Sequence, residues 1–101
     1  MNRLNRLLLV IRHAYAMWQA LNAPKNRSKG SWDHIEPHML IRLAKGELEE
    51  LHVALWQFGK GEAGADRVEE EAADLSAYAA MIADMARKKE KAASTAWSHN
   101  I

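Results

Sequence analysis

Apolar residues recur at helical spacing through three separate segments of the chain, and this periodicity constrains the fold more than any other feature. The segments span residues 2–21, 33–59 and 66–91, and none of them alternates apolar and polar residues as a β-strand does. We therefore predict an all-α fold, an antiparallel bundle of three to four helices. The expected apolar stripe of the first helix contains Leu4, Leu7, Leu8, Ile11, Tyr15 and Trp18, and that of the third contains Val68, Ala72, Leu75, Ala79, Ile82 and Ala86.

Helix-breaking residues separate the segments. Pro24 and the polar run over residues 25–30 end the first helix. Gly59 and Gly61 end the second helix. Because the loop that follows, residues 60–65, is short, the second and third helices should pack face to face as an antiparallel hairpin.

Capping boxes mark the expected starts of the second and third helices. Asp33 is followed three residues later by Glu36, and Asp66 is followed by Glu69. The tail over residues 92–101 has weak periodicity, so a short fourth helix, a docked arm and disorder all stay open.

The length of the chain favours a single domain, 1–101, made of an N-terminal helix (1–22), a helical hairpin (33–91) and the tail (92–101). A chain of 101 residues buries only about 60–65% of its unfolded surface. Its own core is therefore thin, and we expect dimerisation to complete the bundle.

Composition excludes several classes of protein. The formal net charge is +1, which argues against a nucleic-acid partner. The chain has no cysteine, so it has neither a disulfide nor a thiolate metal site. The longest apolar run, residues 7–11, is too short to cross a bilayer. We expect a cytoplasmic protein without a membrane partner.

Two pairs of carboxylates fall within the apolar stripes of the second and third helices. Glu47 and Glu50 lie three residues apart on the second helix, and Glu71 and Asp74 lie three apart on the third. At about 100° per residue, both pairs face inward on the same flank of their stripes. Glu49 falls on the solvent side of its helix and is not a candidate.

The two pairs lie at similar depth from the connecting loop, so the hairpin should bring them together. A buried carboxylate is costly unless it is protonated, paired or bound to a cation, and few basic residues share these faces. Clustered carboxylate oxygens suit hard cations such as Mg²⁺ or Mn²⁺. The alternative is four ordinary surface acids on alanine-rich helices, and we favour the metal site.

The order of these acids resembles the MazG-like family of all-α nucleoside triphosphate pyrophosphohydrolases. The chain reads Glu47-x-x-Glu50, then twenty residues, then Glu71-x-x-Asp74. The family pattern is E-x-x-E, a variable spacer, and E-x-x-D. The resemblance covers residues 31–86.

A second motif supports this resemblance. Trp32 and Asp33, followed by His38, look like the family's W-D-x-x-Q-x-H segment, although Glu36 stands at the position of the family's glutamine.

The resemblance implies Mg²⁺-dependent hydrolysis of (deoxy)nucleoside triphosphates to a nucleoside monophosphate and pyrophosphate. Glu47, Glu50, Glu71 and Asp74 would bind Mg²⁺, for which Mn²⁺ could substitute. Glu47 or Glu50 would orient or deprotonate the attacking water. The resemblance also points to a homodimer or a dimer of dimers.

Four further residues are candidates for substrate contacts. Trp32 and His38 could contact the base, Tyr78 could line the pocket, and Lys45 is the basic residue nearest in sequence to the acids. Each has an alternative packing or surface role. Trp18 and Trp56 are assigned to the core.

The main rival function is a non-catalytic helical module for dimerisation or interaction. A nucleic-acid site in the basic run over residues 87–91 is a minor alternative, because those residues also complement the dipole at the end of a helix.

Overall fold

Three long α-helices make up most of the protein: α1 (Arg3–Leu21), α3 (Pro37–Gly59) and α4 (Ala65–His99). The computed structural model describes residues 1–24, 32 and 35–99, with side chains described as far as residue 95. No β-strand occurs within these ranges, which confirms the all-α prediction. None of the described helices is long and apolar enough to cross a bilayer.

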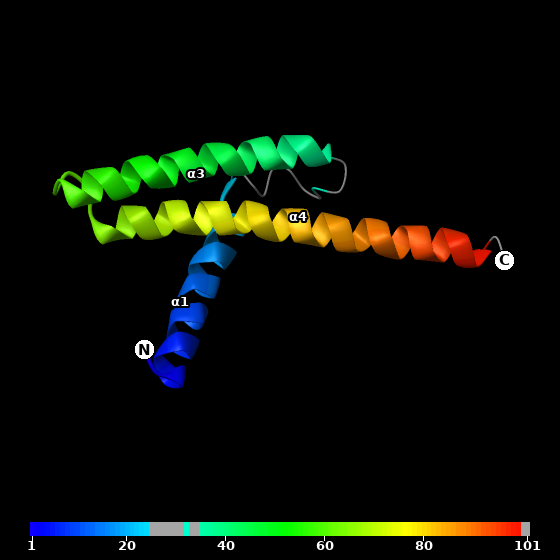
Figure 1. The fold of residues 1–101 in the computed structure, drawn as a ribbon, viewed down its shortest axis with the longest axis horizontal. Helices are drawn as coiled ribbons and strands as arrows, with labels where there is room; N and C mark the ends of the chain where they lie inside the picture. The colour runs from blue at the N-terminus through cyan, green and yellow to red at the C-terminus, as the bar shows by residue number, and fades with distance from the viewer. Residues whose placement is uncertain (25–31, 33–34, 100–101) are drawn as a thin grey trace.

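The helices form a hairpin with one arm. α3 and α4 run antiparallel, and α4 continues well past the start of α3 (Figure 1). α1 crosses α4 steeply and then leaves the hairpin (Figure 1). Among the described helices, α1 packs on α4, and its backbone does not come close to that of α3. The radius of gyration is 16.9 Å, against about 13 Å for a compact domain of about 100 residues, so the single chain is extended.

The start of α3 differs from the sequence prediction. The helix begins at Pro37, and Glu36 is its N-cap: the Glu36 carboxylate accepts a hydrogen bond of 3.2 Å from the Met39 N–H. A proline in the first turn costs no hydrogen bond, because that N–H has no partner within the helix. The expected cap Asp33 lies outside the described residues.

The turn between α3 and α4 is a Schellman motif. The Glu62 N–H donates to the Gln57 carbonyl at 2.8 Å, and the Gly61 N–H donates to the Phe58 carbonyl at 3.0 Å. Gly61 has φ of 76°, a left-handed conformation that glycine adopts without steric cost. The predicted stop at Gly59 and Gly61 is therefore confirmed.

α4 is longer than its expected span of 66–91. It runs without a break to His99, so residues 92–99 continue α4 and do not form a separate helix or a docked arm. Residues 86–95 are all exposed. This part of α4 is rich in Ala and Lys, whose high helix propensity favours helix without packing.

The core is small and has two parts. Leu40, Tyr78, Met81 and Met85 form one cluster between α3 and α4, and Ala20, Ala73 and Ala77 form another between α1 and α4. The alanines let the backbones of α1 and α4 approach closely.

The buried face of α4 is turned by roughly 140° from the predicted stripe. Ala79 and Ala86 are exposed, whereas Ala77 and Met81 are fully buried. The reason is that α3 and α1 pack on adjoining sides of α4, which centres the buried face near Asp74.

The expected apolar stripe of α1 does not face the core. α1 packs on α4 through its opposite face, around Ala16, Met17 and Ala20. The assignment of Trp18 and Trp56 to the core is also wrong for the single chain, since each is 59% exposed.

Candidate metal centre

Three of the four predicted carboxylates meet between α3 and α4. One oxygen each from Glu47, Glu71 and Asp74 lie within 4.8 Å of one another. Two ligand oxygens on one Mg²⁺ are at most about 4.2 Å apart, because each lies about 2.1 Å from the ion. A small movement of the side chains would therefore let all three share a cation.

Glu50 adjoins this group from the solvent side. It is exposed, as expected for the edge of the α3 stripe, and its carboxyl group is close enough to that of Glu71 to raise the pKa of Glu71. The hairpin thus brings all four predicted acids together. Glu49 is exposed, as expected from its position on the helix.

The environment of Glu71 disfavours its charged form. Burial raises the pKa of Glu71, and the neighbouring carboxyl groups of Glu50, Asp74 and Glu47 raise it further. Its Oε2 atom is buried and accepts no hydrogen bond from the described residues. Such an oxygen is costly unless a proton or a cation satisfies it. The donor set, all carboxylate oxygen, fits a hard divalent cation.

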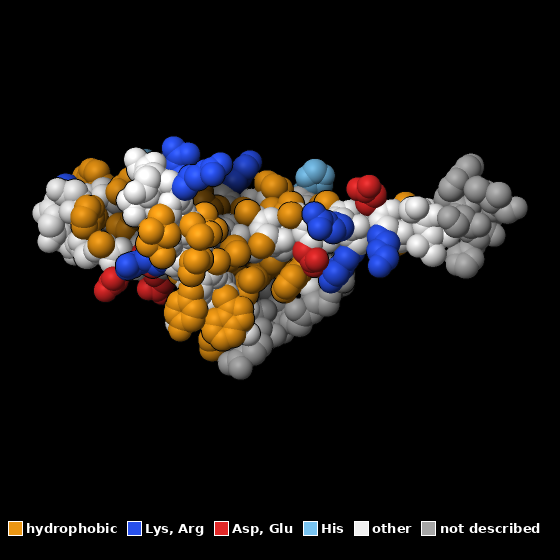
Figure 2. Space-filling view, turned by 90° about the horizontal axis from the view of Figure 1, so that it is seen from below, with side chains coloured by type: hydrophobic (Ala, Val, Ile, Leu, Met, Phe, Trp, Pro, Cys, Tyr) orange, Lys and Arg blue, Asp and Glu red, His pale blue; other side chains and the backbone are white. Residues whose placement is uncertain are grey.

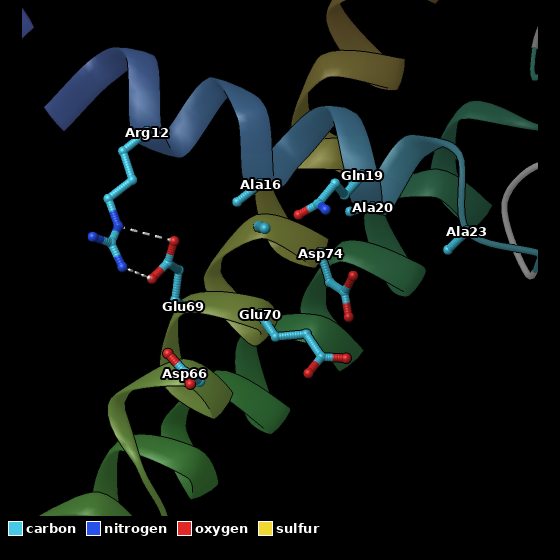
Figure 3. A pocket seen from close by; sticks show the side chains of 10 residues that line it. Arg12, Ala16, Gln19, Ala20, Ala23, Asp66, Glu69, Glu70 and Asp74 are labelled. Carbon is cyan, nitrogen blue, oxygen red and sulfur yellow. Dashed lines mark hydrogen bonds and ion pairs between the residues drawn. The ribbon is translucent and has the colours of Figure 1, made fainter. Parts of the chain in front are cut away.

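An open cleft of about 440 Å³ lies between α1 and α4 and reaches this cluster at Asp74 (Figure 3). α1 lines the cleft with Arg12, Ala16, Gln19 and Ala20, Ala23 lines it just after α1, and α4 lines it with Asp66, Glu69, Glu70, Ala73 and Asp74. Gln19 and Asp74 lie at the same end of the cleft (Figure 3). The cleft therefore opens directly onto one of the candidate metal ligands.

Two polar contacts hold α1 against α4 beside the cleft. The Arg12 guanidinium donates two hydrogen bonds to the Glu69 carboxylate, at 3.2 Å and 3.0 Å. The hydrogen bond to Arg12 lowers the pKa of Glu69. His13 Nε2 and Ser76 Oγ form a third hydrogen bond of 2.7 Å. Glu69 was expected to cap the start of α4, and its engagement with Arg12 replaces that role.

Trp32 anchors the segment before α3 to α4. Its indole N–H donates to Asp84 Oδ2 at 2.9 Å, and Lys88 Nζ lies 3.0 Å from the same oxygen. The half-buried ring also packs against the cluster around Leu40.

The other proposed substrate contacts lie apart from the acids or within the core. His38 and Lys45 are exposed on α3, and Lys45 projects about 160° away from Glu47 around the helix. Tyr78 is 4% exposed and belongs to the core cluster with Met81.

Arg12 and Gln19, which line the cleft, were not among the residues predicted for the site. No pattern in the α1 sequence predicts that they line a cleft, because the cleft exists only through the way α1 crosses α4.

No protein-family model matches the chain, and no curated protein or solved structure matches it significantly. The fold and the site define an all-α protein whose helical hairpin carries a cluster of carboxylates.

Proposed function

We propose that this protein hydrolyses (deoxy)nucleoside triphosphates to a nucleoside monophosphate and pyrophosphate, with Mg²⁺ as its cofactor. The observation that carries the proposal is the carboxylate cluster, in which oxygens of Glu47, Glu71 and Asp74 lie within 4.8 Å of one another. The E-x-x-E and E-x-x-D spacing of these acids, which resembles that of MazG-like pyrophosphohydrolases, supports the same reaction.

Glu47, Glu50, Glu71 and Asp74 would hold the cation, and Mn²⁺ could replace Mg²⁺. When bound, such a cation neutralises the charge of the phosphates and of the transition state. Its binding would also remove the need for a proton on Glu71.

Glu50 is our first choice for the base that activates water, because it alone of the four acids is exposed. A water beside it would attack the phosphorus bonded to the nucleoside oxygen. The new P–O bond forms as the bond to the bridging oxygen of pyrophosphate breaks, and the water proton passes to the carboxylate. Glu47, on the same face of α3, is the alternative base.

The cleft between α1 and α4 is the proposed entrance for the nucleotide. Its volume of about 440 Å³ is typical of small-molecule sites. Asp66, Glu69 and Glu70 make its wall acidic, so the triphosphate should enter as a metal complex and not as the free anion. Gln19 offers both a donor and an acceptor beside Asp74.

A screen for pyrophosphate release over canonical and modified nucleoside triphosphates tests the proposal. We expect release that requires Mg²⁺ or Mn²⁺ and is lost in Glu50→Gln and Glu71→Gln, while circular dichroism stays unchanged. Glu49→Gln is the matched control, since Glu49 is an exposed acid on the same helix. Absence of release with every nucleotide, or full activity in Glu71→Gln, would contradict the proposal.

A non-catalytic interaction module is the second candidate, because α1 and α3 expose many large apolar side chains. On that reading Mg²⁺ leaves the melting temperature unchanged, and so do Glu47→Gln and Asp74→Asn. For either function we propose a cytoplasmic homodimer or dimer of dimers.

A further inference from the structure

The apolar residues of α1 form a continuous exposed stripe. The leucine stripe consists of Leu4, Leu7, Leu8, Ile11, Tyr15 and Trp18, each between 54% and 62% exposed. Seen along α1 from below, hydrophobic side chains dominate the surface of this helix (Figure 2). Soluble proteins rarely leave a contiguous apolar patch of this kind uncovered.

The leucine stripe cannot turn inward while α1 keeps its present contacts. Relative to Leu4, its members fall between about −60° and 40°, whereas His13 and Ala20 fall near 180° and 160°. Rotating α1 to bury the stripe would break the hydrogen bond between His13 and Ser76 and the packing of Ala20. Something outside this hairpin must therefore cover it.

α3 carries a second exposed apolar stripe. Ile41, Leu48 and Leu55 follow one another at intervals of seven residues, so they share one side of the helix. They are 43%, 53% and 55% exposed. Since the backbones of α1 and α3 do not approach each other, each helix presents its own uncovered face.

The two faces match in length. α1 has 19 residues and α3 has 23, or about 28 Å and 34 Å of helix.

In a dimer with two-fold symmetry, a single partner chain can cover both faces. If α1 of each copy packs on α3 of the other, neither stripe remains exposed and the assembly closes. Six side chains with on the order of 100 Å² of exposed apolar surface each supply roughly 600 Å² from α1 alone. With α3 added, the area reaches the roughly 800 Å² per partner of a stable interface.

We propose that the leucine stripe of α1 packs against the Ile41–Leu48–Leu55 face of α3 in a second copy of this chain. This interface does not depend on the proposed hydrolysis. A membrane surface fits the leucine stripe less well than a second chain does. A helix that lies in a membrane interface keeps its polar face in water, whereas the opposite face of α1 is covered by α4.

Sedimentation equilibrium of the whole chain tests the interface. The wild type should have twice the mass of one chain. Its melting temperature should also rise with chain concentration, a measurement that needs no variant. Ile11→Glu and Leu48→Glu should each halve the mass. Val10→Glu is the matched control, because Val10 is 62% exposed on α1 but lies about 120° from Leu4, outside the stripe.

Several results would overturn the proposal. A wild-type monomer at all concentrations would do so, as would a monomer that instead co-sediments with vesicles of anionic phospholipid. Equal dissociation of Val10→Glu would show that the leucine stripe is not the contact surface. Dissociation by Ile11→Glu but not by Leu48→Glu would refute the pairing of α1 with α3.

Discussion

A carboxylate oxygen of Glu47 on α3 lies within 4.8 Å of one of Glu71 on α4. Two carboxylates this close repel each other unless a proton or a cation balances their charge. The contact between the two helices therefore depends on what occupies the space between these acids. Protonation, cation binding and stability of the hairpin are consequently linked at these two residues.

We expect Mg²⁺ to raise the melting temperature of the wild type. A ligand that binds only the folded chain stabilises it by about 2.7 kcal/mol when its concentration is a hundred times its dissociation constant. Asp74→Asn should remove the effect, because it replaces a candidate ligand that is 8% exposed. Differential scanning fluorimetry with and without Mg²⁺ measures the shift. Glu49→Gln should respond like the wild type, and a full response in Asp74→Asn would argue against the site.

Glu71→Gln should stabilise the metal-free protein at neutral pH. The substitution removes a charge that burial and three neighbouring carboxyl groups disfavour. We expect a melting temperature higher by a few degrees in the presence of a chelator. A lower melting temperature would mean that favourable interactions in the folded chain offset the charge of the Glu71 carboxylate, contrary to this prediction.

The same residue predicts a pH dependence. Because the pKa of Glu71 is raised above its ordinary value of 4.5, the folded chain holds this proton more tightly than the unfolded chain. Its contribution to stability is full below pH 4.5 and is lost as pH rises through the raised pKa. Urea unfolding of the wild type and of Glu71→Gln in the presence of a chelator isolates this contribution. The difference between their free energies of unfolding should widen as pH rises. A constant difference would contradict the raised pKa.

Gly46→Ala should stabilise α3 by up to about 1 kcal/mol, the difference in helix propensity between the two residues. A Cβ atom added at Gly46 meets nothing within 4 Å. Gly61→Ala is the contrasting variant: it should destabilise the chain by about 1–2 kcal/mol, because φ of 76° strains any residue with a side chain. Urea unfolding should give a higher free energy of unfolding for Gly46→Ala and a lower one for Gly61→Ala.

Leu40→Ala should cost about 2–5 kcal/mol, since Leu40 is fully buried at the centre of the small core. That cost is a large share of the total stability of a small domain. Met39→Ala, its neighbour at 43% exposure, should cost far less. Similar losses for the two variants, measured by urea unfolding, would contradict the described core.

The hairpin and the convergence of the four acids were predictable because both depend on local features. Helical phase places Glu47 and Glu50 on one face of α3, and the glycine-rich turn returns the chain so that Glu71 and Asp74 meet them. Lys45 shows the limit of reasoning from sequence distance alone. It is two residues from Glu47 along the chain, but helical phase carries it to the other side of α3.

The sequence by itself determined the three helices, the turn at Gly61 and the pairing of the acids, since periodicity and capping act within a few residues. Only the tertiary structure decided which faces are buried. An apolar stripe indicates that something covers a helix and does not identify what covers it. α1 and α3 share the surface of α4, which centres its buried face near Asp74 and leaves the leucine stripe of α1 exposed.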